Sequence, residues 1–164
     1  MLANHLVELL RRSNDRLVLA ESCTGGQVAS LITQISGVSD CFCGSFVTYL
    51  DQVKVDWLGV DKLSIDRFSA VSSEVARQMV EGALNRTGEA TLAAAITGHL
   101  GPGAPVELDG TVFLSIAFRT SSSPQFKVVQ CSLRGKERIE RKNEATTALL
   151  EFVCAELEAK RASA

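Results

Sequence analysis

A serine and a cysteine stand side by side where a short apolar run gives way to glycines. Residues 16–20 (RLVLA) are followed directly by residues 21–26 (ESCTGG). On a sharp turn between a strand and a helix, a nucleophile is exposed, and free backbone N–H groups can hold an oxyanion or a phosphate. Two glycines at a helix start cost helix stability, which favours a functional reason for them. The segment predicts nucleophilic catalysis, with a simple helix cap by Ser22 or Thr24 as the alternative.

Ser22 and Cys23 compete for the role of nucleophile. A thiol is intrinsically more reactive, but it needs a base to become a thiolate, and that base is usually histidine. The chain has two histidines, His5 and His99, and His5 falls in the first predicted helix. A serine can instead use a lysine as its base. The scarcity of histidine therefore favours Ser22.

Lys54 is the candidate base. Residues 41–49 (CFCGSFVTY) are rich in strand formers, and Asp51 can cap a short helix after them. Lys54 would lie one turn into that helix and point back over the sheet edge towards Ser22. A lysine base must be neutral, so its pKa has to fall through burial or a neighbouring cation. The alternatives are a solvated surface lysine and, for Tyr49, an ordinary strand aromatic.

Two further segments have residues suited to holding a phosphate. Residues 97–103 (TGHLGPG) form a glycine-rich loop that can wrap a phosphate with its N–H groups or simply be a turn. The stretch 134–142 is basic, and its Arg141 could reach a phosphate. Its alternative is a solvated helix face with acidic residues interleaved.

Hydrophobic periodicity predicts the elements that position these segments. Helices are expected at 2–12, from the glycines to about 35, from Asp51 to Gly59, from Ser72 or Ser73 to Gly88, and at 136–160; strands are expected at 16–20, 41–49, 91–96, 111–118 and 126–131. This alternation predicts a three-layer α/β/α sandwich with a mixed, mostly parallel sheet of about five strands. The loop between the last two strands is too short for a parallel crossover, so that pair should be antiparallel. Ligands bind beyond the carboxyl ends of parallel strands, where 21–26, 49–54 and 97–103 should meet.

Composition narrows the class of protein. The 164 residues suit a single domain spanning 1–164, and a net charge of −2 argues against nucleic-acid or membrane partners. Five cysteines without a repeating pattern argue against a disulfide framework, and two histidines argue against a zinc site, so no metal is expected. The N-terminus lacks the pattern of a signal peptide and no apolar run approaches ~18 residues, which predicts a cytoplasmic protein.

Several motifs occur together in one order. They are AESCTGG at 20–26, GSFVTY at 44–49 with Lys54 after it, LGV at 58–60, AVSSEVA at 70–76, AITG at 95–98, GPG at 101–103 and GTV at 110–112. Together they resemble the C-terminal domain of the CinA family, the nicotinamide-nucleotide amidases, most strongly over residues 16–118. The chain opens directly at the first helix, so we expect a stand-alone form of that domain.

The resemblance implies a reaction and a set of residues. Family members hydrolyse the carboxamide of nicotinamide mononucleotide to nicotinate mononucleotide and ammonia. It implies Ser22 as nucleophile, Lys54 as base and Tyr49 in the pocket. The implied substrate-binding residues are Cys23, Thr24, Gly25, Gly26, Thr97, Gly98, Gly101, Gly103 and Arg141. A small-molecule substrate, no cofactor and a homo-oligomer are also implied.

Three departures from the family pattern keep other functions open. Residues 104–109 (APVELD) are shorter than the usual glycine-rich form, His99-Leu100 replaces a small apolar pair, and Lys136-Glu137 replaces a common Asp-Arg pair. The alternatives are an amidase for another small amide and a nucleotide-binding or regulatory protein without catalysis. The burial of Lys54 separates them, because a surface lysine with an ordinary pKa would favour binding alone.

Overall fold

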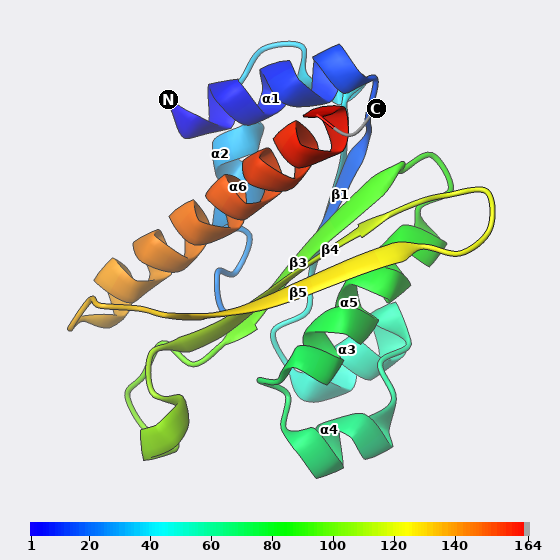
Figure 1. Cartoon of the computed structure of the whole chain (residues 1–164). Coiled ribbons are helices and arrows are strands. Elements are labelled where there is room, and N and C mark those ends of the chain that lie inside the picture. The colour runs from blue at the N-terminus through cyan, green and yellow to red at the C-terminus, as the bar shows by residue number, and fades with distance from the viewer. Residues whose placement is uncertain (163–164) are drawn as a thin grey trace.

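A computed structural model, which describes residues 1–162, contains one five-stranded sheet between two layers of helices (Figure 1). The strands are β1 (Leu17–Glu21), β2 (Phe42–Val47), β3 (Leu92–Gly98), β4 (Thr111–Phe118) and β5 (Gln125–Ser132), in the order β2-β1-β3-β4-β5. β1 is parallel to β2 and β3, while β4 is antiparallel to β3 and β5. Four strands therefore run in one direction and β4 in the other, which confirms the predicted mixed sandwich.

Helices pack on both faces of the sheet (Figure 1). One face carries α1 (Leu2–Ser13), α2 (Gln27–Ile32) and α6 (Arg138–Ala162). On the other face α5 (Ser73–Arg86) packs on the strands, and α3 (Asp51–Leu58) and α4 (Lys62–Phe68) pack against α5. Short 3₁₀ turns occur at Val38–Asp40 and Val106–Leu108. Within residues 1–162, no helix combines the length and apolar character needed to cross a membrane.

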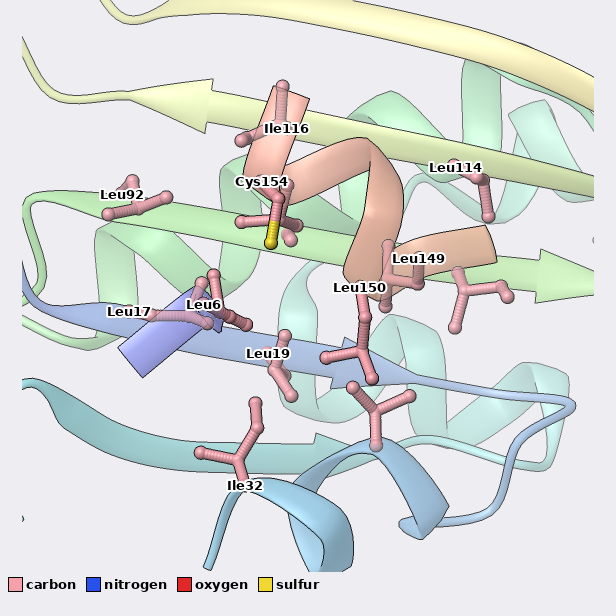
Figure 2. Packing of buried hydrophobic residues seen from close by; sticks show 14 of the residues in the cluster. Leu6, Leu17, Leu19, Ile32, Leu92, Leu114, Ile116, Leu149, Leu150 and Cys154 are labelled. Atoms are coloured by element: carbon pink, nitrogen blue, oxygen red, sulfur yellow. The ribbon is translucent and has the colours of Figure 1, made fainter. Parts of the chain in front are cut away.

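The central strands are buried on both faces, and their residue types differ between the faces. Leu17 and Leu19 of β1 face the α1, α2 and α6 layer, where they pack near Leu6, Ile32 and Leu150 (Figure 2). The opposite face of β3 and β4 presents alanines, namely Ala93, Ala95 and Ala117. Small side chains let α5 approach the sheet closely, as interior close packing requires.

α3, which carries Lys54, is held tightly against α5. A Cβ added to Gly82 of α5 would lie 2.0 Å from the carbonyl oxygen of Leu58 at the end of α3. Only glycine fits at that contact, because real carbon atoms do not come so near a carbonyl oxygen. The close approach sets the position of α3 relative to the sheet.

Most predicted boundaries differ from the structure by one to three residues, and one helix was not predicted. β2 ends at Val47 rather than Tyr49, α2 ends at Ile32 rather than near 35, and α5 ends at Arg86 before Gly88. α4 was not predicted, because its only buried residue is Ser64 and it therefore lacks an apolar stripe. Asp61, whose side chain accepts from the Leu63 N–H, was the capping signal for it.

Candidate active site

The three predicted segments meet at the carboxyl ends of β1, β2 and β3 around a pocket of about 380 Å³. The turn after β1, the start of α3, the connection between α4 and α5, the loop after β3 and the first turn of α6 line it. Its lining includes Ser22, Cys23, Tyr49, Lys54, Thr97 and Arg138. The sheet topology brings these side chains together, as expected for an open α/β sheet.

Ser22 lies directly after β1 with an available hydroxyl. Its N–H donates to the carbonyl of Ile96 (3.1 Å), which ties the start of the turn to β3. Among residues 1–162 its hydroxyl has no hydrogen-bond partner, and the residue is 7% exposed on the pocket wall. A ligand in the pocket can therefore reach a hydroxyl that is not already engaged.

Cys23 is a poor competitor for the role of nucleophile. The thiol is buried beside the pocket, and burial raises its pKa to about 12. Because the thiolate is the reactive form, such a thiol stays protonated and unreactive at neutral pH. The geometry favours Ser22, as the scarcity of histidine predicted.

Lys54 is buried, so the alternative of a solvated surface lysine is wrong. Only 1% of the residue is exposed, and its Nζ donates to the Tyr49 carbonyl and to Asp51 Oδ1, both at 3.3 Å. Burial lowers the pKa of the Lys54 ammonium, while the nearby Asp51 carboxylate opposes that change. Two of its three N–H groups have acceptors, and the third can serve a group in the pocket.

Tyr49 and Arg138 form the rim of the pocket. Tyr49 is 56% exposed, and its hydroxyl accepts a hydrogen bond from Arg138 Nη2 (2.7 Å). Arg138 Nη1 donates to the carbonyl of Gly101, so this arginine joins the tyrosine to the 97–103 loop. The guanidinium is exposed and retains further donors for an anion.

Arg141, the arginine selected from the sequence, borders a neighbouring pocket instead. Its guanidinium forms a two-point ion pair with Asp109, at 2.7 and 2.9 Å. The Arg141 guanidinium beside Asp109 holds the pKa of that carboxyl below its ordinary value. Arg138 belongs to the same basic stretch and lies three residues before Arg141, hence on the same face of the helix, but the sequence alone did not distinguish it from Arg141.

The 97–103 loop lines the pocket as predicted, including Thr97, Gly98, Gly101 and Gly103. The Thr97 hydroxyl donates to the carbonyl of Ala70 (2.8 Å), so it anchors the α4–α5 connection. A Cβ on Gly98 would lie 2.4 Å from a Val112 methyl, which explains the glycine there. Gly101 and Gly103 have φ values of +65° and +85°, a backbone region that favours glycine.

The glycines of the ESCTGG segment do not line the pocket, contrary to the expected cradle. The Gly25 N–H donates to the carbonyl of Ser22 (3.0 Å), and the Gly26 N–H donates to the Glu21 carboxylate (3.0 Å). Thr24 is fully buried, and its hydroxyl also donates to Glu21. Within residues 1–162, the N–H groups of Cys23 and Thr24 are the two in this turn without an acceptor.

Comparisons with known proteins agree on one family. The sequence model of the family described as the CinA C-terminal domain matches residues 1–157 of this chain. A CinA-like protein of Chlorobium phaeovibrioides is 47% identical over 120 residues, which are 72% of this chain and 28% of the relative. A CinA-like protein of Nostoc punctiforme is 39% identical over 140 residues, which are 84% and 33% of the two chains. The chain thus spans about a third or less of these curated relatives.

Solved structures with the same fold match the chain over nearly its whole length. A competence-damaged protein (CinA) superfamily protein from Klebsiella pneumoniae superposes with a TM-score of 0.89 and 26% identity, covering 96% of both chains. The competence/damage inducible protein CihA from Agrobacterium tumefaciens superposes with a TM-score of 0.83 and 34% identity, covering 94% of this chain and 96% of that one.

Proposed function

The chain belongs to the CinA C-terminal domain family, and we propose that it is an amidohydrolase that converts nicotinamide mononucleotide to nicotinate mononucleotide and ammonia. The observation that carries this proposal is that the buried Lys54 lines the same pocket as Ser22. Burying a lysine is unfavourable for its charged form, and a lysine that loses its proton readily is what a serine nucleophile needs. A lysine that served only to hold a nucleotide phosphate would act through its charged form, which burial disfavours here.

In the proposed reaction, Ser22 Oγ attacks the amide carbon while neutral Lys54 takes the hydroxyl proton. Lys54 then gives that proton to the departing nitrogen as the C–N bond breaks, and ammonia leaves. Water next attacks the acyl-enzyme, with Lys54 again as base, and the acid product is released. As the ester bond to Ser22 breaks, Lys54 gives that proton to Ser22 Oγ, which restores the serine hydroxyl and the neutral lysine.

The developing oxyanion needs donors close to Ser22. The N–H groups of Cys23 and Thr24 are suited to this role because neither has an acceptor among residues 1–162. Elsewhere, loss of one such donor costs about 3 to 4 kcal/mol of transition-state stabilisation. The N–H groups of Gly25 and Gly26 already donate to the Ser22 carbonyl and the Glu21 carboxylate, so they are not assigned this role.

The pocket suits a small polar ligand. Its volume of about 380 Å³ is within the range of ~300 to 1,000 Å³ for small-molecule sites. We propose that Arg138 binds the 5′-phosphate, since its exposed guanidinium is at the rim and Arg141 is paired with Asp109. The Tyr49 hydroxyl can donate to the same ligand while it accepts from Arg138.

A second candidate is an amidase with the same mechanism and a different small amide. His99 and Ala104, which belong to the segments that depart from the family pattern, both line the pocket. They place an altered side chain and a shortened loop against any ligand. We also propose a role in pyridine-nucleotide salvage and a homo-oligomeric assembly. Both proposals rest on the resemblance to the family.

The test is to incubate purified protein with nicotinamide mononucleotide, follow ammonia release and detect the acid product by mass. Product from the wild type that disappears in a folded Ser22→Ala variant supports both the activity and the nucleophile. Full activity in Ser22→Ala contradicts the nucleophile assignment. Absence of product together with thermal stabilisation by the nucleotide would identify a binding protein. Absence of both would point to another substrate, and a panel of small amides then tests the second candidate.

A further inference from the structure

Glu21, the residue before the nucleophile, has a fully buried carboxylate surrounded by donors. It accepts five hydrogen bonds. Oε2 accepts from the Thr24 hydroxyl (2.8 Å) and the N–H groups of Gly26 (3.0 Å) and Val28 (3.1 Å); Oε1 accepts from the Ala29 N–H (3.0 Å) and the Ser45 hydroxyl (3.0 Å). Hydrogen bonds of this number stabilise an ionised carboxylate away from water.

This carboxylate replaces an ordinary helix cap. Helix α2 has Gly26 as its N-cap residue, and that position provides no side-chain cap. Gly26 has a φ of +90°, a backbone region that favours glycine, so the usual serine, threonine, asparagine or aspartate cap would be strained at this position. Instead the N–H groups of Gly26, Val28 and Ala29 donate to Glu21, which directly precedes Ser22. Capping of the helix and orientation of the nucleophile are therefore coupled.

The network joins three elements around one turn. Glu21 ends β1, four of its donors belong to the turn and to α2, and Ser45 belongs to β2. The turn is further closed by the Gly25 N–H, which donates to the Ser22 carbonyl. Once these groups are paired, the N–H groups left over in the turn are those of Cys23 and Thr24, which follow Ser22 directly.

We infer that Glu21 is a positioning residue whose buried carboxylate holds the 22–26 turn so that the Ser22 hydroxyl and the N–H groups of Cys23 and Thr24 converge on one reacting carbonyl. Glu21 does not line the pocket, so it acts through the turn and not by touching substrate. This inference rests on the proposed function. It adds a residue outside the pocket to the machinery that stabilises the transition state.

The first experiment is Glu21→Gln. The new NH₂ group would face groups that donate, so at least one N–H or hydroxyl in the network would lose its acceptor. Because the turn acts on the transition state more than on ground-state binding, we expect kcat to fall at least tenfold while KM stays within about twofold. Glu21→Asp keeps the charge and should recover part of the loss.

Asp15→Asn is the matched control. Asp15 is also a buried carboxylate, 4% exposed, and accepts from the Thr91 hydroxyl (2.7 Å) and the Lys160 ammonium (3.0 Å). It lies before the amino end of β1, away from the pocket lining. This variant should lower the melting temperature and leave kcat unchanged. If kcat simply follows lost stability, Asp15→Asn will lose it too, and the inference is overturned.

A fluorophosphonate probe reads Ser22 without any natural substrate. Ser22 Oγ forms a bond to phosphorus, the P–F bond breaks, fluoride leaves and the serine proton passes to Lys54. Intact-mass measurement should show labelling of the wild type and of Asp15→Asn at similar rates, and labelling of Glu21→Gln at least tenfold slower. Labelling and turnover of Glu21→Gln at wild-type rates would overturn the inference.

The same measurements separate the two proposals. A wild type that is labelled but does not hydrolyse nicotinamide mononucleotide refutes the substrate, while slow labelling of Glu21→Gln still supports the positioning role. A wild type that does neither refutes both. If Glu21→Gln does not fold, Ser45→Ala removes one donor and keeps the charge. It should lower kcat and labelling severalfold, and unchanged values in that folded variant would refute the positioning role.

Discussion

Replacing Arg138 with methionine tests how the pocket recognises a phosphate. Methionine keeps much of the apolar stem and removes the guanidinium, which now bonds the Tyr49 hydroxyl (2.7 Å) and the Gly101 carbonyl. A hydrogen bond to a charged group contributes ~1.5 to 3 kcal/mol, which corresponds to a factor of ~10 to 150 in affinity. Arg138 is exposed, so water competes for the phosphate and we expect the lower end, about tenfold.

The assay compares two substrates, nicotinamide mononucleotide and its dephosphorylated nucleoside, by steady-state ammonia release. Arg138→Met should lower kcat/KM for the nucleotide about tenfold, mainly through KM, and change the nucleoside value much less. The preference for the phosphorylated substrate should therefore shrink by the same factor. Arg138→Lys should recover only part of it, because lysine lacks the planar fork that binds two oxygens at once.

Arg141→Met is the control on the same helix. Its guanidinium is paired with Asp109 and borders the neighbouring pocket, so the substrate preference should stay within about twofold of the wild type. An unchanged preference in Arg138→Met would refute the assignment of the phosphate to this arginine. A larger loss in Arg141→Met would return the phosphate to the residue first selected from the sequence.

Three further predictions concern the base, the thiol and the fold. Removing the Asp51 carboxylate should lower the pKa of Lys54, because that acid favours the charged lysine. In Asp51→Asn the acid limb of the pH profile of kcat/KM should therefore move to lower pH. A move to higher pH would contradict Lys54 as base. Cys23→Ala should keep most of the activity, since burial raises the thiol pKa to about 12; loss of activity in a folded variant would reopen the thiol mechanism. Gly82→Ala should destabilise the protein by ~1 to 3 kcal/mol through overpacking, because its Cβ would lie 2.0 Å from the Leu58 carbonyl oxygen. In the control Gly88→Ala the new Cβ meets nothing within 4 Å, so this variant should melt close to the wild-type temperature.

The sequence by itself predicted the fold class and the edge of the sheet at which the candidate site lies. Alternating apolar runs and helical spacing are local signals, and residues 17–20 of β1 are apolar on both faces, as a strand covered on both sides requires. Parallel strands then bring their carboxyl ends to one edge, so the segments with Ser22, Lys54 and Thr97 had to meet. The choice of Ser22 over Cys23 also followed from residue types alone.

The tertiary structure decided which group each polar residue serves. Arg138 and Arg141 lie on one helix, but Asp109, distant in sequence, pairs with Arg141 and leaves Arg138 to contact Tyr49. The helix N–H groups of the glycine turn, open to an anion by sequence, are taken by Glu21. Burial of Lys54 likewise depends on how α3 packs. A local pattern specifies backbone geometry and one buried face, whereas a hydrogen-bond partner is chosen by competition among residues that only folding brings together.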